Sequence, residues 1–200
     1  MFASNLLEGR VALVTGGGTG ICRGIALAFA AHGCDVAITS RKIEHLEPTA
    51  AELRATGRRA IAKAADVRDP AAIGAVVEAT VAELGRLDIL INGAAGNFIC
   101  LAENLSPNGF GTVVDIDLKG TFHASNAALP HLRLAADRSS TSARRCTHLG
   151  TIGAVARGGG EGRHRLAHAH AGVRVGTVCG IRVNGIAPGS DRRHRGRARG

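Results

Sequence analysis

The stretch from Arg10 to Ile21 constrains the fold of this chain more than any other. It opens with a short apolar run over residues 11–14, which predicts a buried parallel strand. The run stops at a glycine cluster, and apolar residues then recur at helical spacing as far as Phe29. A strand, a glycine turn and a helix in this order can hold a pyrophosphate against free N–H groups at the helix N-terminus. The candidate nucleotide site is therefore Gly16, Gly17, Gly18, Thr19, Gly20 and Ile21. The alternative is a glycine turn with a structural role only.

Length and composition favour one α/β domain over residues 1–200, since 45% of the 200 residues are hydrophobic. No apolar run approaches the roughly 18 residues of a membrane span, and residues 1–5 lack a signal-peptide pattern. We therefore expect no membrane partner. The 5 cysteines form neither a CxxC pair nor a metal-ligand spacing, which favours a reducing, cytoplasmic location and no metal site.

The net positive charge of the chain comes from its C-terminal third. Residues 1–133 carry 12 basic and 13 acidic side chains, whereas residues 134–200 carry 13 arginines, no lysine and 3 acids. A basic protein often binds nucleic acid. This segment has no aromatic residue to stack on a base, so we expect no specific nucleic-acid partner.

A second predicted strand, residues 35–39, ends at Ser40 and Arg41. In a dinucleotide-binding fold the end of this strand meets the adenosine ribose. An acid there would favour NAD, whereas a hydroxyl followed by arginine suits the additional phosphate of NADP. The alternative for Arg41 is an ordinary surface charge.

Strands and helices continue to alternate further along the chain. After a predicted helix over residues 43–56, a strand at 60–64 leads to Asp66 and Val67, and a strand at 87–92 leads to Asn92, Gly93 and Ala94. The Asp66 carboxylate is placed to accept from the adenine amino group; alternatively it only begins the turn before Pro70. The alternation predicts a Rossmann-type α/β fold with a doubly wound parallel sheet.

Four motifs in this order resemble the short-chain dehydrogenase/reductase family. They are Thr15-Gly16 with Gly20-Ile21, Asp66-Val67, Asn92-Gly93-Ala94, and IRVNGIAPG at 181–189. Within the family, residues 93–98, 105–108 and 115–118 resemble the peroxisomal-type 2,4-dienoyl-CoA reductase branch. The resemblance covers residues 7–133 and 180–189.

The resemblance implies an NADPH-dependent oxidoreductase that reduces an unsaturated acyl-CoA in fatty-acid oxidation. It adds Pro188 and Gly189 to the cofactor-binding residues and implies a CoA ester bordered by Arg41, Arg68, Phe98, Ser106, Pro107 and Asn108. Asp117 matches the aspartate that, in this branch, works with a lysine on a water molecule. The alternative for Asp117 is a helix-surface acid. Family members associate into homo-oligomers.

The chain departs from the family pattern at three points. Cys22 replaces the third glycine of the turn, where it is expected to crowd the helix start and weaken cofactor binding. The chain has no tyrosine, although most of the family uses a tyrosine as general acid. Its last lysine is Lys119, so the lysine partner of Asp117 has no counterpart.

Residues 134–179 show neither strand nor helix periodicity, and the family pattern resumes at Gly180. Back-translation of residues 154–179 and a shift of one nucleotide yields PLHAGAAKAVIDSLTRTLAFEWGPY, with synonymous codons chosen freely. That string resembles the missing helix of the branch, and its lysine arises from the codons of Glu161 and Gly162. We infer a reading-frame slip here and a second one after Gly189. The alternative is a genuine basic, disordered extension.

A slip predicts a Rossmann-type sheet that is incomplete after residue 133. The fifth strand, the active-site loop and the lysine helix would be lost, and an apolar face left open would favour aggregation. A catalytically dead NADP-binding fragment is therefore the alternative to an active reductase. Homo-oligomers are not expected of the chain as written.

Overall fold

The computed structural model describes residues 3–96, 101–137, 147–152 and 181–186. The strands are β1 (Val11–Thr15), β2 (Asp35–Ser40), β3 (Ala60–Ala64), β4 (Ile89–Asn92), β5 (Thr147–Ile152) and β6 (Ile181–Ile186). The α-helices are α1 (Gly20–Ala31), α2 (Glu47–Ala55), α3 (Pro70–Leu84), α4 (Pro107–Val113) and α5 (Gly120–Asp137). Two 3₁₀ turns, η1 (Ile43–His45) and η2 (Ala102–Asn104), and a π-helical segment, η3 (Val114–Lys119), complete the described elements.

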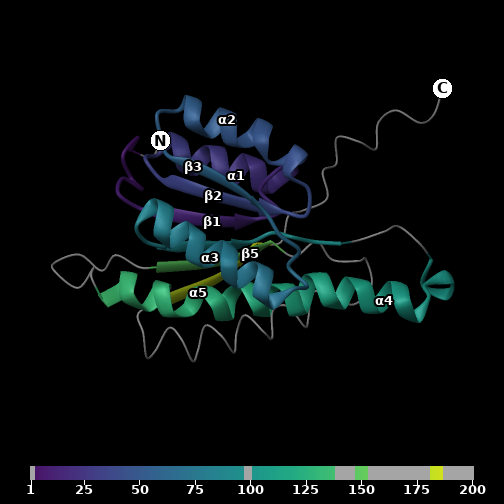
Figure 1. Cartoon of the computed structure of the whole chain (residues 1–200). Helices are drawn as coiled ribbons and strands as arrows, with labels where there is room; N and C mark the ends of the chain where they lie inside the picture. The colour runs from purple at the N-terminus through teal and green to yellow at the C-terminus, as the bar shows by residue number, and fades with distance from the viewer. Residues whose placement is uncertain (1–2, 97–100, 138–146, 153–180, 187–200) are drawn as a thin grey trace, which may run out of the picture.

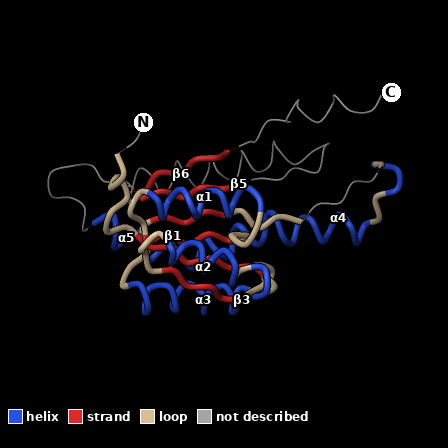
Figure 2. The backbone as a smooth tube through the Cα atoms, turned by 90° about the horizontal axis from the view of Figure 1, so that it is seen from above, coloured by secondary structure: helices blue, strands red, loops and turns tan. Residues whose placement is uncertain are grey.

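The strands form one sheet in the order β3-β2-β1-β4-β5-β6, and each pair of neighbouring strands is parallel. Helices α1 and α2 cover one face of the sheet, and α3 and α5 cover the other (Figures 1 and 2). The direction of winding reverses between β1 and β4. In a doubly wound sheet, ligands bind beyond the carboxyl ends of the strands at such a point.

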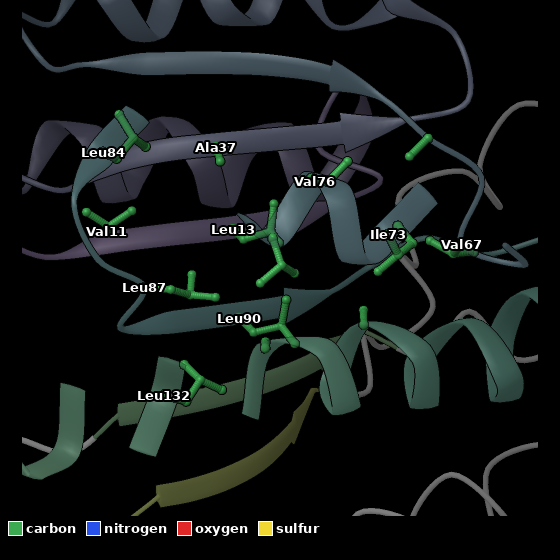
Figure 3. Close-up of a cluster of buried hydrophobic side chains, with 14 of the residues drawn as sticks. Val11, Leu13, Ala37, Val67, Ile73, Val76, Leu84, Leu87, Leu90 and Leu132 are labelled. Atoms are coloured by element: carbon green, nitrogen blue, oxygen red, sulfur yellow. The ribbon is translucent and has the colours of Figure 1, made fainter. Parts of the chain in front are cut away.

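Each face of the sheet carries its own hydrophobic core, and β1 supplies alternate residues to both. Val11 and Leu13 belong to the core under α3 and α5, whereas Ala12 and Val14 belong to the core under α1 and α2. Figure 3 shows Leu13 beside Leu90, its partner on β4. All five residues of β1 are buried, as expected for a central strand of a parallel sheet.

The helix predicted over residues 43–56 is interrupted. The structure has the turn η1, then Leu46, and only then α2. Pro48 accounts for the break, because proline lacks an N–H and fits only the first turn of a helix.

The predicted Rossmann-type doubly wound parallel sheet is confirmed, and its strands continue beyond residue 133, where the sequence predicted an incomplete sheet. β5 lies within residues 134–179 and fills the place between β4 and β6, with Ile91 opposite Gly150 and Leu149 opposite Val183. Helix α5 also continues to Asp137. A strand between two parallel neighbours is held by backbone hydrogen bonds on both sides and needs no side-chain alternation, so periodicity missed it. The predicted lysine helix and the tail at 190–200 lie outside the described residues.

Candidate cofactor and active site

The glycine turn after β1 packs too closely against its neighbours for larger side chains. Gly16 has a φ of +71°, which favours glycine, and its N–H donates to Thr39 O at 2.7 Å. A Cβ on Gly17 would lie 2.7 Å from Ile38 Cγ2, and a Cβ on Gly18 would lie 2.6 Å from His45 O. The backbone itself is therefore the surface that a ligand meets here.

The N-terminus of α1 is open to an anion. The Thr19 side chain caps no N–H group of the helix, and the first turn contains no acid. Ile21, in that turn, is 53% exposed. An uncapped helix start beside a side-chain-free turn fits the pyrophosphate of a dinucleotide, with an apolar residue available to the rest of the ligand. Gly16 to Ile21 would hold that group.

Charged side chains follow β2 and β3 at the carboxyl ends of these strands, on the same side of the sheet as the glycine turn. Arg41 is exposed directly after Ser40, whose hydroxyl donates to Lys42 O at 3.3 Å. Beyond β3, the Asp66 carboxylate accepts hydrogen bonds from the Arg68 guanidinium, including one of 2.6 Å from Nη2. These bonds, more than the nearby charge of Arg41, hold the pKa of Asp66 below its usual range. The adenine amino group predicted to donate to Asp66 would share this carboxylate with Arg68.

The end of β4 is tied to the end of β1. The Thr15 hydroxyl accepts from the N–H groups of Gly93 and Ala94 at 3.0 and 3.1 Å. Asn92 is buried at the end of β4, and its amide donates to Ser125 Oγ on α5 at 3.1 Å. The predicted motif residues 92–94 thus lie beside the glycine turn.

Asp117 lies in η3, where the long helix formed by α4, η3 and α5 has π geometry. Its carboxylate accepts from Gly96 N at 2.9 Å, and its backbone carbonyl accepts from the Thr121 hydroxyl at 2.6 Å. The residue is 6% exposed, so it is not the surface acid of the alternative interpretation. Short π-helical segments are frequent at functional sites. The helix therefore presents one buried carboxylate to the loop after β4.

Lys119 does not take the place of the lysine that works with the matching aspartate in the 2,4-dienoyl-CoA reductase branch. Its ammonium pairs with Asp115 Oδ1 at 2.7 Å, and its side chain is 62% exposed, whereas Asp117 is buried. The two side chains therefore leave the helix in different directions.

The described residues predicted to border the substrate fall into two groups. Arg41 and Arg68 lie near Asp66, after β2 and β3, whereas Ser106, Pro107 and Asn108 lie at the start of α4. Ser106 caps the start of α4, where its hydroxyl oxygen accepts from Gly109 N at 3.1 Å. Pro107 and Asn108 follow in the first turn of α4, which extends away from the sheet (Figure 1). At about 1.5 Å per residue, Pro107 is roughly 15 Å along the helix axis from Asp117. Phe98, Pro188 and Gly189 lie outside the described residues.

Three hydrogen bonds to the loops that follow β1, β3 and β4 were not predicted from the sequence. The buried Thr49 of α2 donates to Gly18 O at 3.0 Å, and His123 of α5 donates from Nδ1 to Val67 O at 2.9 Å. Cys22 is buried and donates from Sγ to Gly93 O at 3.6 Å. Thr49 lies in the first turn of α2, and His123 lies within the long helix formed by α4, η3 and α5. No local pattern distinguishes either residue from a core residue.

Comparison with known proteins gives a consistent set of relatives. Residues 10–142 match the short chain dehydrogenase family. The peroxisomal 2,4-dienoyl-CoA reductases of Arabidopsis thaliana and Danio rerio are each 40% identical, over 94% of this chain and 66% and 63% of their own length. A Bacillus subtilis protein named as a probable 2,4-dienoyl-CoA reductase is 37% identical over 92% of this chain and 73% of its own. The chain thus spans a little under two thirds of the first two relatives.

Solved structures agree with the fold. A short chain dehydrogenase from Burkholderia cenocepacia in complex with NADP has a TM-score of 0.80 and 31% identity, over 93% of this chain and 76% of its own. A 3-ketoacyl-(acyl-carrier-protein) reductase from Brucella melitensis complexed with NADH has a TM-score of 0.81 and 27% identity, over 91% and 75%. Among the described helices, none is both long and apolar enough to cross a membrane. The chain belongs to the short-chain dehydrogenase family of oxidoreductases, and it resembles the 2,4-dienoyl-CoA reductases within that family.

Proposed function

We propose that this protein is an NADPH-dependent reductase of 2,4-dienoyl-CoA esters. One observation carries the proposal: a buried carboxylate, Asp117, is fixed to the loop after β4 at the edge where the glycine turn opens. The 40% identity with proteins named peroxisomal 2,4-dienoyl-CoA reductase supports the substrate class. Because the chain spans under two thirds of those relatives, their activity is proposed for it rather than established.

NADP is the cofactor that the charges favour. Arg41 is exposed at the end of β2, and neither residue 40 nor residue 41 is an acid that would repel a 2′-phosphate. A guanidinium can meet that phosphate with a fork of charged donors. The related structures contain NADP in one case and NADH in another, so the preference rests on Arg41.

NADPH, held by the glycine turn and Arg41, would supply a hydride to the far carbon of the conjugated diene. The electron pairs of the two double bonds then shift toward the thioester carbonyl, giving an extended enolate, and one proton from water completes the reduction. Asp117 orients that water through its carboxylate, while the Gly96 N–H keeps the carboxylate in place. Protonation of the carbon next to the thioester carbonyl would leave one double bond. This agrees with the names of the two relatives at 40% identity, which describe them as (3E)-enoyl-CoA-producing.

The compartment is a separate part of the proposal. The cytoplasmic location predicted from the cysteines differs from the peroxisomal location printed in the names of the Arabidopsis and Danio relatives, while the Bacillus relative carries no such word. Both described cysteines, Cys22 and Cys34, are buried free thiols, which suits any reducing compartment that contains NADPH. The proposed function requires no membrane, nucleic acid or metal.

The test is NADPH consumption by the full chain with and without a 2,4-dienoyl-CoA. We expect consumption that depends on the dienoyl-CoA and falls by about 100-fold or more in Asp117→Asn. The asparagine keeps an oxygen for the Gly96 N–H but loses the charge, so NADPH affinity should stay within about twofold. Unchanged turnover in Asp117→Asn would remove Asp117 from the mechanism.

A second candidate function is NADP binding without turnover. The specific observation in its favour is that the sequence has no tyrosine and no lysine after Lys119. The same experiment separates the two: NADPH binding with no consumption in the presence of dienoyl-CoA supports the second candidate. Absence of NADPH binding contradicts both.

A further inference from the structure

Helix α5 is fastened to the turn that follows β3. The His123 ring donates from Nδ1 to Val67 O at 2.9 Å, because a carbonyl oxygen can only accept. The bond joins residues 56 positions apart, and the His123 side chain is half-buried. It connects the helix that carries Asp117 with the turn that carries Asp66.

The same helix face fits Val67 at a second point. A Cβ on Gly120 would lie only 2.6 Å from Val67 Cγ2, and Val67 itself is 6% exposed. Gly120 and His123 are three residues apart, so they lie on the same side of the helix. Close packing at Gly120 and the hydrogen bond from His123 therefore hold the turn after β3 against α5.

The peptide group between Val67 and Arg68 is held from both of its sides. Its carbonyl oxygen accepts from His123, and its N–H donates to Asp66 Oδ1 at 2.9 Å. A peptide group fixed through both its donor and its acceptor has little freedom to rotate. These two bonds therefore favour one conformation of the turn after β3.

We propose that His123 is a positioning residue for the adenosine half of the cofactor site. The inference rests on the proposed NADPH binding, in which Asp66 and Val67 meet the adenine. By holding Val67 O, His123 fixes the turn before the cofactor arrives, so binding does not have to order it. Removing the imidazole then weakens binding of the adenosine end without touching the glycine turn.

The test measures binding of 2′,5′-ADP, which carries the adenosine and the 2′-phosphate but no nicotinamide, to the full chain by calorimetry. We expect His123→Leu to weaken binding about three- to tenfold, the effect of one lost hydrogen bond. His123→Asn, whose amide can donate in place of Nδ1, should stay within about twofold of the starting protein. Rescue by this variant distinguishes a donated hydrogen bond from general packing.

The matched control is His131→Leu, two turns further along α5. His131 also makes a hydrogen bond to another helix, but its partner is Glu78 of α3 at 3.0 Å, and not a residue of the turn after β3. We expect no change in 2′,5′-ADP affinity. Equal affinity in His123→Leu and the starting protein would overturn the inference, as would equal losses in the two leucine variants. Failure of the starting protein to bind 2′,5′-ADP would instead contradict the proposed function.

Discussion

Cys22 and Gly93 form a size-complementary pair where α1 meets the loop after β4. A Cβ on Gly93 would lie 2.1 Å from Cys22 Sγ, so the cysteine requires a glycine opposite. The thiol donates to Gly93 O, and burial raises its pKa. The Cys22 side chain therefore crowds residue 93. The predicted effect of Cys22 on cofactor affinity remains a prediction.

Gly93→Ala should lower the free energy of unfolding by about 1–3 kcal/mol, because overpacking a buried contact forces neighbours apart. Cys22→Ala removes the sulfur, so adding it to Gly93→Ala should recover much of the loss. Recovery will be incomplete, since the new Cβ would also lie 3.0 Å from Thr15 O. Urea unfolding of the two single variants and the double variant measures the coupling. Strictly additive effects would show that the two residues do not oppose each other.

Helix α2 supports the glycine turn through one side chain. Thr49 is 1% exposed and donates to Gly18 O, which orients the carbonyl in the middle of the turn.

Thr49→Val should weaken NADPH binding about three- to tenfold, because the isosteric valine leaves Gly18 O without this donor. Thr49→Ser keeps the hydroxyl and should bind nearly as the starting protein does. The control is Thr80→Val: Thr80 is equally buried but donates to Val76 O within its own helix, at 2.8 Å. A titration in which Thr49→Val and Thr80→Val weaken binding equally would contradict the role of Thr49.

The sequence allowed the first four strands and the residues at their carboxyl ends to be predicted, because short apolar runs ending in glycine or polar residues are local patterns. The start of α3 also carries a local signal, since Asp69 accepts from Ala71 N and Ala72 N and Pro70 is next in the chain. The β5 strand was not predicted, because its pairing partners, rather than its own residues, determine it. The bonds of Thr49 and His123 depend on which helices pack together, which no local pattern encodes.

The whole molecule combines a well-patterned first part with a later segment whose residues do not follow the family. β5 and β6 complete a sheet of six strands, so the backbone plan extends beyond residue 133. The lysine that should accompany Asp117 is nevertheless absent from the sequence after Lys119. We propose a frame slip as the cause, because it would change the residues of this segment and remove that one chemical group.

The gene, or that of a close relative, should then encode an Ala-Lys helix one nucleotide out of phase, ending in Glu-Trp-Gly-Pro shortly before Gly180. DNA sequencing measures this directly. A single-base correction at each slip should yield an enzyme that is oligomeric, whereas the present chain should not be. If no shifted frame contains a lysine at the codons of Glu161 and Gly162, the slip is excluded and the basic segment is genuine.

We propose that the carboxyl ends of the strands bind NADPH through the glycine turn and Arg41. The most direct measurement is a titration of the full chain with NADPH and with NADH, followed by fluorescence. We predict that NADPH binds at least about tenfold more tightly, as one charged contact to the 2′-phosphate provides. Arg41→Asp should reverse the preference, because a carboxylate repels that phosphate and accepts from a ribose hydroxyl. Equal affinities of the starting protein for the two cofactors would contradict the assignment.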